Sequence, residues 1–383
     1  MELYVHLPFC LQKCRYCDFV SFPGLEGRMR EYVDALLWEA EYYREKVNEP
    51  IRTVYFGGGT PSLLPPDLLS NLIKGLKENL PLDEVQEWTV EANPGTVTNV
   101  WLETALQGGI NRISIGMQAA QDYLLKKIGR IHNMKDVKES VYKARSAGFQ
   151  NLNLDLMFGL PGQAMQDWAE TIDCILDLDP EHISAYGLIP EENTLLYRDL
   201  QDGILSLPDE NQERNMYDYL LNILDKNNYL QYEISNFSKP GYDCAHNIGY
   251  WTLVPYLGIG ISAASMTDIA IESDGMHYLR QTNIKDINAY FYSVRNKKPA
   301  SEEKTVISPA EARFETIMLG LRMNRGVNEK DFQRLHGVSI ESCYGQKLHI
   351  LASQGLVMFE DNCWRLTRAG MDLQNSILVE LME

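Results

Sequence analysis

The chain of 383 residues lacks several features that mark specialised classes of protein. Its longest apolar stretches fall far short of the about 20 residues that are needed to span a bilayer. Its N-terminus has no basic segment followed by an apolar core, so no export signal is visible. Repeats, linkers and low-complexity tracts are also missing. We therefore expect a globular protein of the cytoplasm, and the hydrophobic fraction of 45% is enough for a large core.

Positive charge is scarce as well. The sequence has 35 basic residues against 53 acidic ones, which gives a net charge of −18. A surface with this balance repels the phosphate backbone of nucleic acids. We therefore expect no nucleic acid as a main partner, and we interpret the acidic excess as a solubility feature.

Cysteine is sparse too, but three of the seven cysteines lie close together at Cys10, Cys14 and Cys17, with the spacing C-x3-C-x2-C. The seven show no disulfide pattern, which fits a reducing compartment. Three thiolates on one loop can hold three irons of a [4Fe–4S] cube and leave the fourth open, whereas electron carriers usually supply four cysteines. The alternatives are a redox thiol or a zinc site with His6 as its fourth ligand.

Strand-like apolar runs recur along the first half of the chain. They span Leu3–His6, Thr53–Phe56, Trp88–Glu91, Arg112–Ile115, Leu152–Met157 and His182–Leu188. Helical patterns lie between most of them, over Arg28–Lys46, Asp67–Leu80, Met134–Ala147 and Met165–Leu176. This alternation predicts an α/β fold with a parallel sheet. Periodicity alone allows either a partly open barrel or a doubly wound sheet.

The pattern changes after about Lys304. Amphipathic helices are predicted at Pro309–Asn324 and Glu329–His336, followed by a hairpin of Gly355–Val357 and Cys363–Thr367 and by a last helix. This order looks like a winged-helix module. The acidic balance indicates that the module packs on the rest of the chain or meets a protein rather than DNA.

Polar and glycine-rich motifs follow or end several of the predicted strands. They are Tyr4-Val-His-Leu-Pro-Phe-Cys10, Gly57-Gly-Gly-Thr-Pro61, Glu91-Ala-Asn-Pro-Gly95, Ser114-Ile-Gly-Met-Gln118 and Asp155-Leu-Met-Phe-Gly-Leu-Pro161. Together with the cysteine spacing, and in this order, they resemble the radical SAM enzymes, and in particular the oxygen-independent coproporphyrinogen III oxidase group. The resemblance implies a partial (β/α)6 TIM-like barrel with its ligands at the carboxyl ends of the strands.

The resemblance also implies a [4Fe–4S] cluster on the three cysteines, with S-adenosyl-L-methionine (SAM) at the open iron. The residues matched to SAM are Tyr4, Tyr16, Gly58, Gly59, Thr60, Glu91, Gln118, Arg130 and Asp155. Glu91 would accept hydrogen bonds from the ribose hydroxyls, and Arg130 would pair with the SAM carboxylate. Taken singly, each of these residues also has an ordinary structural explanation, such as a packing turn at the glycines.

Two departures separate the chain from the oxidases. The oxidases carry a further cysteine two positions after the third, where this chain has Phe19, and they have an N-terminal extension, whereas this chain starts its first strand almost at once. In addition, His246-Asn-Ile-Gly-Tyr-Trp251 matches the HNxxYW motif of haem chaperones related to the oxidase. That match implies haem binding by His246, Asn247, Tyr250 and Trp251, with the histidine as axial ligand.

Two other readings of the histidine motif stay open. His246 is otherwise a histidine within an aromatic cluster, and Cys244 is a possible soft ligand in its place.

The expected function is therefore a haem chaperone that carries a cluster and SAM. It would receive haem from a donor protein and transfer it to apo-haemoproteins such as respiratory enzymes, meeting the membrane through these partners. The alternatives are coproporphyrinogen III oxidation and another radical SAM reaction on a tetrapyrrole, and no residue is assigned a catalytic role. We expect a barrel over residues 1–240, a haem-motif and connecting segment over 241–303 and the C-terminal module over 304–383.

Overall fold

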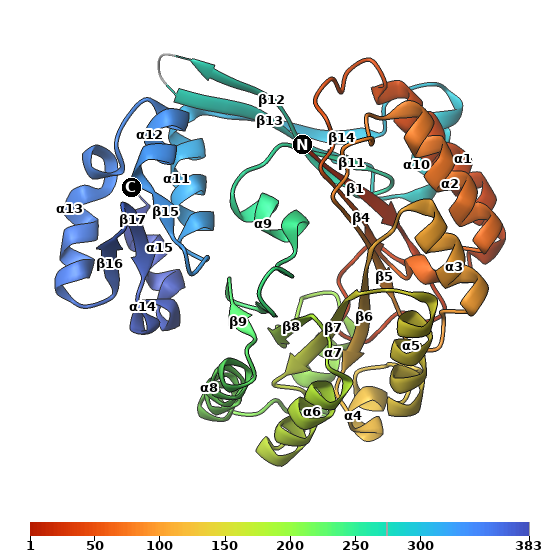
Figure 1. Ribbon diagram of the computed structural model, residues 1–383, viewed down its shortest axis with the longest axis horizontal. Coiled ribbons are helices and arrows are strands. Elements are labelled where there is room, and N and C mark those ends of the chain that lie inside the picture. Colours follow the sequence, from red (N-terminus) through yellow and green to blue (C-terminus); the bar gives the residue numbers. More distant parts are fainter. Residues whose placement is uncertain (273–274, 383) are drawn as a thin grey trace.

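The computed structural model describes residues 1–272 and 275–382. Parallel strands alternate with helices and form a curved sheet (Figure 1). The strands are β1 (Glu2–Leu7), β4 (Thr53–Gly58), β5 (Glu87–Ala92), β6 (Arg112–Gln118), β7 (Asn151–Phe158) and β8 (His182–Gly187). Each overlaps one of the predicted strands, and neighbours in this series pair in parallel. The predicted α/β fold is therefore confirmed.

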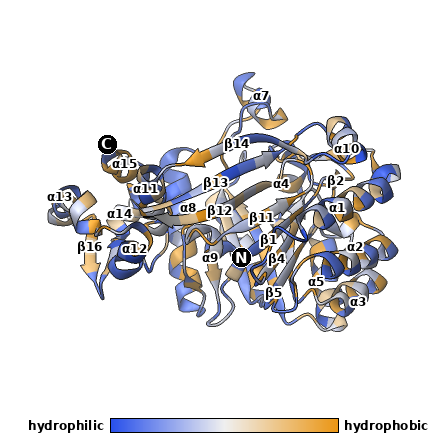
Figure 2. Cartoon of the chain, turned by 90° about the horizontal axis from the view of Figure 1, so that it is seen from above, coloured by the Kyte–Doolittle hydropathy of each residue, from blue (hydrophilic) through white to orange (hydrophobic). Residues whose placement is uncertain are grey.

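Helices surround this sheet, most of them on its convex face, and the helix Leu195–Gln201 lies against the cysteine loop, where Leu196 N donates to Arg15 O. They are α1 (Met29–Tyr43), α2 (Pro66–Asn79), α3 (Asn99–Gly108), α4 (Asp122–Lys127), α5 (Met134–Ala147), α6 (Met165–Leu178), α7 (Leu195–Gln201) and α8 (Glu210–Lys226), with short 3-10 turns at Glu26–Arg28 and Pro61–Leu63. The outer helices combine hydrophilic and hydrophobic residues (Figure 2), as expected of helices with one face on a core. The four predicted helices of this region are confirmed, whereas α3, α4, α7 and α8 were not predicted.

Helix α5 shows how the local sequence sets such a helix. Asn133 caps its first turn by accepting a hydrogen bond from the backbone of Asp136, whose carboxylate accepts one from the backbone of Asn133. The buried Val137, Val141 and Ala144 lie on one face. The helix ends at Gly148, which has a φ of 115°, a conformation that glycine adopts without strain.

Further strands extend both edges of the sheet. Strand β11 (Tyr256–Ile259) pairs in parallel with β1, and β12 (Ala264–Glu272), β13 (Gly275–Asn283) and β14 (Ser301–Ile307) continue beyond it in antiparallel fashion. At the other edge, β10 (Asn236–Ser238) and β9 (Leu230–Gln231) follow β8. Within the described ranges no ladder joins β9 to β14, so the barrel stays open. The sequence had predicted only a connecting segment where β11 to β14 lie.

Two more helices belong to the barrel region. Helix α10 (Ile287–Arg295) packs on α1. Helix α9 (Ala245–Trp251), which carries the HNxxYW motif, lies inside the curve of the sheet (Figure 1). The small strands β2 (Phe9–Cys10) and β3 (Phe22–Pro23) pair with each other on either side of the cysteine loop.

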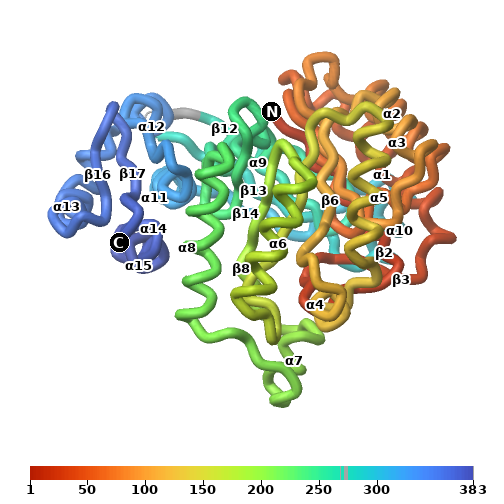
Figure 3. The backbone as a smooth tube through the Cα atoms, turned by 60° about the horizontal axis from the view of Figure 1, so that its bottom comes forward, coloured from red at the N-terminus to blue at the C-terminus, as the bar shows by residue number. Residues whose placement is uncertain are grey.

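The C-terminal module lies to one side of the barrel, where β13 contacts α11 and α12 (Figure 3). Its elements are α11 (Pro309–Gly320), β15 (Val327–Asn328), α12 (Glu329–His336), α13 (Ile340–Ser353), β16 (Val357–Glu360), β17 (Cys363–Leu366), α14 (Arg368–Asp372) and α15 (Gln374–Leu381). The predicted hairpin is present, although its first strand begins two residues later than expected, and α13 was not predicted. The module has a hydrophobic core of its own around Phe332, Leu348 and Trp364. The three domain ranges stay a prediction.

The length and composition of the helices show whether any of them could cross a membrane. In residues 1–272 and 275–382, no helix combines the length and the apolar character that a membrane crossing requires.

Candidate functional site

The cysteine loop is anchored on the end of the first strands. Two backbone hydrogen bonds from the turn after β4 hold the start of the loop: Gly59 N donates to Leu7 O at the end of β1, at 2.9 Å, and Thr60 N donates to Phe9 O on β2, at 2.7 Å. A Cβ atom on Gly59 would lie 2.7 Å from Phe9 O, closer than non-bonded atoms normally approach. The glycines of this turn therefore let the cysteine strand pack directly on the barrel.

The three cysteines line a common cavity of about 360 Å³ at the carboxyl ends of the parallel strands. We call it the cluster cavity, and its other lining residues include Tyr16, Tyr55, Gly58, Gly59, Glu91, Asn93, Ser114, Gln118, Arg130, Asp155 and Tyr186. Its volume falls in the range of about 300–1,000 Å³ that is usual for small-molecule sites. Of the nine residues matched to SAM, seven line it, and Tyr4 and Thr60 do not.

The thiols fit a cluster better than a single ion. Burial raises the pKa of Cys10, and it raises the pKa of Cys17 to about 11, so iron or another cation is needed to stabilise their thiolates at neutral pH. Within the part of the chain that the structure describes, no three His, Cys, Asp or Glu side chains converge closely enough to hold one metal ion. The three cysteines share one cavity of about 360 Å³, which has room for a group of several atoms.

The zinc alternative loses its proposed fourth ligand. His6 Nε2 lies 2.8 Å from Val20 O, and His6 Nδ1 lies 3.1 Å from the Tyr4 hydroxyl. Both ring nitrogens are therefore engaged. A Cβ on Gly58, whose φ is +108°, would lie 2.4 Å from the His6 ring, so the histidine packs under the glycine turn.

Arg130 connects the cysteine loop to two strand ends. Its Nη1 lies 3.6 Å from Cys14 Sγ, and its Nη2 donates to Asn93 Oδ1 at 2.7 Å and to Gly116 O at 2.8 Å. The guanidinium is thus held at the cavity wall as a fixed positive charge beside a thiol. It is suited to a carboxylate ligand, because a planar fork of donors matches carboxylate geometry.

Two half-buried carboxyl groups, of Glu91 and Asp155, line the same cavity. Burial, reinforced by the charge of Asp155, raises the pKa of Glu91 to about 7, although Glu91 accepts hydrogen bonds from the Tyr55 hydroxyl at 2.9 Å and from Gly58 N at 3.1 Å. Burial also raises the pKa of Asp155, which accepts hydrogen bonds from Ser114 and Asn153. Each carboxylate oxygen has two lone pairs, so both groups keep capacity for the hydroxyl groups of a ligand.

Gln118 supplies a direct sign that the cavity is built for a polar ligand. The residue ends β6 with a φ of 61°, and its amide oxygen Oε1 is buried without a hydrogen-bond partner among the described residues. Buried polar atoms are rarely left unpaired. An unpaired amide oxygen, a fixed guanidinium and a glycine cradle together fit a SAM-like molecule, with its amino, carboxylate and hydroxyl groups.

The structure also brings in residues that were not assigned from the sequence. Asn93 donates to the Thr60 hydroxyl at 2.8 Å and accepts from Arg130, and Thr60 in turn lies 3.6 Å from Cys10 Sγ. Asn93 belongs to the Glu91-Ala-Asn-Pro-Gly motif, so the signal was present in the sequence. Tyr55 and Ser114 hold Glu91 and Asp155, and their role is visible only from cross-strand contacts.

The haem-motif residues lie at the opposite end of the barrel. Tyr4, His246, Asn247 and Tyr250 line a smaller cavity of about 190 Å³, together with Tyr55, Arg112, Asn153, Asp155, His182, Ser184, Tyr186, Asn236 and Cys244. We call it the floor cavity. It adjoins the cluster cavity, since Tyr55, Asp155 and Tyr186 line both. Trp251 points elsewhere and lines a pocket beside the C-terminal module.

His246 is closed in by its surroundings. It is 2% exposed, its Nδ1 lies 2.8 Å from the Thr53 hydroxyl, and its Nε2 lies 3.0 Å from the Tyr250 hydroxyl. Burial, with a smaller contribution from the charge of Arg112, lowers the pKa of His246 to about 3, so the ring is neutral. In this arrangement neither nitrogen is open to iron, and haem ligation by His246 would require α9 to leave the barrel floor.

Cys244, the other candidate ligand, is buried as well. Its Sγ donates to Glu87 Oε1 at 3.3 Å, and the same carboxylate accepts from the backbone of Ala245 and His246. Glu87 therefore caps α9 at its N-terminus, where a negative charge is stabilising. Burial raises the pKa of Cys244 to about 12, so the thiol is protonated.

Comparison with known proteins places this site in a family. The model of the Radical SAM superfamily matches residues 4–175, which contain the cysteine loop and β1 to β7, and the model of the HemN C-terminal domain matches residues 307–373. The second match coincides with most of the C-terminal module.

Curated relatives named "Heme chaperone HemW" align over almost the whole chain. The protein from Lactococcus lactis is 34% identical over 379 residues, which cover 99% of this chain and 96% of its own length. The one from Bacillus subtilis is 35% identical over 376 residues, 98% of this chain and 97% of its own. The one from Escherichia coli is 33% identical over 383 residues, 99% and 97% of the two lengths.

A solved structure supports the fold independently. Coproporphyrinogen III oxidase from Escherichia coli, described as a radical SAM enzyme, superposes with a TM-score of 0.85 at 21% identity, over 99% of this chain and 89% of its own. At that identity the likeness concerns the fold, including the open barrel and the C-terminal module.

Proposed function

The chain belongs to the HemW family of haem chaperones, within the radical SAM superfamily, and from this membership we propose that it binds haem and transfers it to apo-haemoproteins. The observation that carries the proposal is the alignment with curated HemW proteins over 98–99% of the chain. Respiratory enzymes are the proposed recipients. We further propose that a donor protein supplies the haem, that membrane contact occurs through these partners, and that transfer takes place in the cytoplasm, where the free thiols stay reduced.

Membership of the radical SAM superfamily implies a [4Fe–4S] cluster and SAM. We propose that Cys10, Cys14 and Cys17 hold the cluster in the cluster cavity. When bound, the two groups together supply one-electron reduction of the sulfonium.

The remaining proposed roles belong to the protein. Arg130 pairs with the SAM carboxylate, Glu91 accepts from the ribose hydroxyls, and the orphaned oxygen of Gln118 accepts a donor of the ligand. The walls of the SAM site are formed by Tyr16, Gly58, Gly59 and Asp155. Thr60 contacts Cys10, and Tyr4 contacts His6, so these two residues support the site from outside the cavity.

The test is haem titration and transfer under anaerobic conditions, with the cluster reconstituted. We expect a stoichiometric Soret band, followed by appearance of the holo form of an added apo-haemoprotein. A Cys10→Ala variant, compared with the matched Cys174→Ala variant on α6, would show whether transfer depends on the cluster. Absence of haem binding by the wild-type protein would contradict the proposal. Formation of protoporphyrinogen from coproporphyrinogen with SAM would support the oxidase alternative instead.

A further inference from the structure

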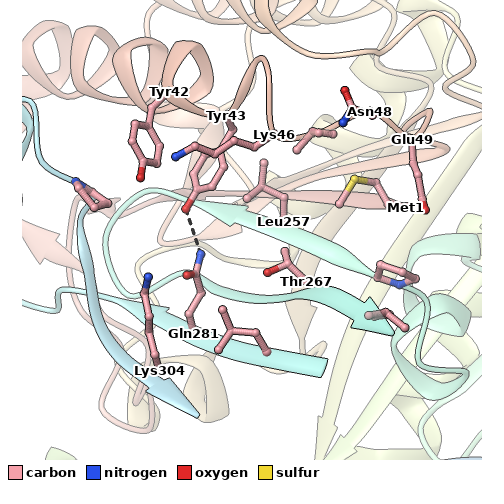
Figure 4. Close-up of a pocket in the computed structure, with 15 residues that line it drawn as sticks. Met1, Tyr42, Tyr43, Lys46, Asn48, Glu49, Leu257, Thr267, Gln281 and Lys304 are labelled. Atoms are coloured by element: carbon pink, nitrogen blue, oxygen red, sulfur yellow. Dashed lines mark hydrogen bonds between the residues drawn. The ribbon is translucent and has the colours of Figure 1, made fainter. Parts of the chain in front are cut away.

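A third cavity lies outside the barrel, between the C-terminal end of α1 and the sheet formed by β11 to β14 (Figure 4). Its volume is about 440 Å³, larger than that of the cluster cavity or the floor cavity. We call it the outer cavity. Tyr42, Tyr43 and Lys46 line it from the helix side. None of its lining residues contributes to the site described above.

The outer cavity has a mixed lining, with an apolar part on the sheet. Leu257 on β11, Ile269 on β12 and Leu279 on β13 line it from the sheet, beside the polar Thr267. Tyr43 is fixed at the cavity, because Gln281 Nε2 donates to its hydroxyl at 3.0 Å. The walls thus combine apolar and polar side chains held on regular elements, which suits a ligand with an apolar body and polar groups.

The rim carries positive charge from both sides. Lys46 extends from the end of α1, and Lys304 from β14, where it pairs in register with Gln281. Neither ammonium forms an ion pair within residues 1–272 and 275–382, although Lys46 Nζ lies 3.0 Å above the ring of Tyr42. Glu49 is the acidic residue at the rim. On a chain with a net charge of −18, two lysines without an acidic partner among the described residues, close to the apolar side chains of the sheet, favour a ligand with an acidic edge.

We propose that the outer cavity is the docking site for haem, with the porphyrin against the leucines of the sheet and the propionates at Lys46 and Lys304. The inference rests on the proposed function for the identity of the ligand. Haem combines a flat apolar body with two carboxylates on one edge, which is the chemistry of this cavity. The floor cavity, at about 190 Å³, is smaller than the about 300–1,000 Å³ usual for ligands of drug size, and its histidine is engaged. An open outer site also leaves the cargo accessible to a recipient.

The test uses the full-length, cluster-loaded protein, titrated with haem and with haem dimethyl ester, which lacks the two negative charges. We expect the double variant Lys46→Glu/Lys304→Glu to weaken haem binding by about tenfold or more and to leave binding of the dimethyl ester unchanged. Lys74→Glu/Lys330→Glu changes net charge equally at exposed sites elsewhere and should bind both ligands as the wild type does. Thr267→Trp places a large side chain in the outer cavity and should weaken the binding of both haem and its dimethyl ester.

The outcomes separate the two proposals. If the wild type binds no haem, the proposed function fails. If the wild type binds haem, and both the charge-reversal and the cavity-filling variants bind it equally well, the outer cavity is not the site. Loss of binding in His246→Ala, with thermal stability unchanged and normal binding by the outer-cavity variants, would assign haem to the floor instead.

Discussion

At the scale of the residue, Arg130 is the side chain that joins the cysteine loop to the strand ends of the cluster cavity. It is half-buried and contacts Cys14, Asn93 and the backbone of Gly116. Because it carries a fixed charge at the wall of the cluster cavity, any carboxylate ligand there gains from it directly.

We expect Arg130→Met to lower the affinity for SAM by about tenfold to a hundredfold, since hydrogen bonds to charged groups contribute about 1.5–3 kcal/mol. Arg130→Lys should fall in between, because a lysine keeps the charge and loses the fork of donors. Isothermal titration of the reconstituted protein measures this, with Arg30→Met, an exposed arginine paired to Asp67, as control. Unchanged SAM affinity in Arg130→Met would remove the residue from the proposed site.

A second prediction at this scale concerns Glu2, in the barrel floor. Burial raises the pKa of Glu2 to about 8 from an ordinary 4.5, so the folded protein keeps a proton that the unfolded chain releases. The free energy of unfolding therefore falls as pH rises through this window. The lowered pKa of His246, about 3 against 6.5, acts in the opposite direction, and its contribution is complete above pH 6.5.

Between pH 6.5 and 8, Glu2 alone of this pair should change stability, by at most about 1.4 kcal/mol per pH unit. Urea unfolding of the wild type and of Glu2→Gln across this range measures their free energies of unfolding. The value for the wild type should fall relative to that of Glu2→Gln as pH rises. Glu26→Gln, at an exposed position, should run parallel to the wild type. Parallel curves for Glu2→Gln would contradict the raised pKa.

At the scale of the element, α9 fills the inside of the barrel at the end opposite to the cysteine loop. It is capped by Glu87 and held by the bond between His246 and Thr53. Its middle residue, Gly249, packs so closely on Glu2 that an added Cβ would lie 1.8 Å from the carboxyl oxygen. Glu2 is 2% exposed, so its carboxyl group would have to shift within the core to relieve this contact.

Gly249→Ala should therefore lower stability by about 1–3 kcal/mol, the usual cost of overpacking a core, even though alanine favours helix by about 1 kcal/mol. The matched substitution Gly27→Ala, where a Cβ meets nothing within 4 Å, should have little effect. Chemical denaturation of both variants measures this. Wild-type stability in Gly249→Ala would mean that α9 is loosely seated and free to leave the floor.

At the scale of the whole molecule, the barrel and the C-terminal module have separate hydrophobic cores. They meet through a small hydrophobic cluster, in which Met276 and Tyr278 of β13 lie with Ala312 of α11, and through ion pairs such as that of Arg280 with Glu315. Because each part keeps a core of its own beside this shared cluster, we expect the two parts to unfold with partial independence.

Trp364→Ala, in the module core, should cost about 3–5 kcal/mol locally. Hydrogen exchange should then lose protection across residues 309–381, while SAM affinity and iron content stay at wild-type values. Phe359→Ala on the same hairpin, where the ring is 51% exposed, should change little. Equal loss of protection in the barrel strands would show that the chain unfolds as one unit.

How far the sequence predicted the fold depended on how local the signal was. The strands β1 to β8 of the parallel series read as apolar runs, because parallel strands are buried on both faces. Strand β14 has the sequence Ser-Glu-Glu-Lys-Thr-Val-Ile and is mostly exposed at the edge of the sheet. Its sequence therefore contains no apolar run that would predict a strand. Helix α3 was missed for a similar reason: its buried residues are only Trp101, Leu102 and Ala105, too few for a clear period.

For the site, the motifs predicted which residues gather at the strand ends, but not how they divide between cavities. Tyr4 was expected beside SAM, yet it lines the floor cavity and touches His6. Its place follows from its position near the middle of β1, which a match of motifs does not resolve.

By itself, the sequence determined the cysteine loop and the strand–helix alternation, because both are set by neighbours within a few positions along the chain. Only the tertiary structure decided where the histidine motif and the outer cavity lie. The contact of His246 with Thr53 joins residues 193 positions apart, and that of Gln281 with Tyr43 spans 238 positions. Such contacts depend on the curvature of the sheet around α9 and on the antiparallel extension beyond β11, and no local pattern encodes either.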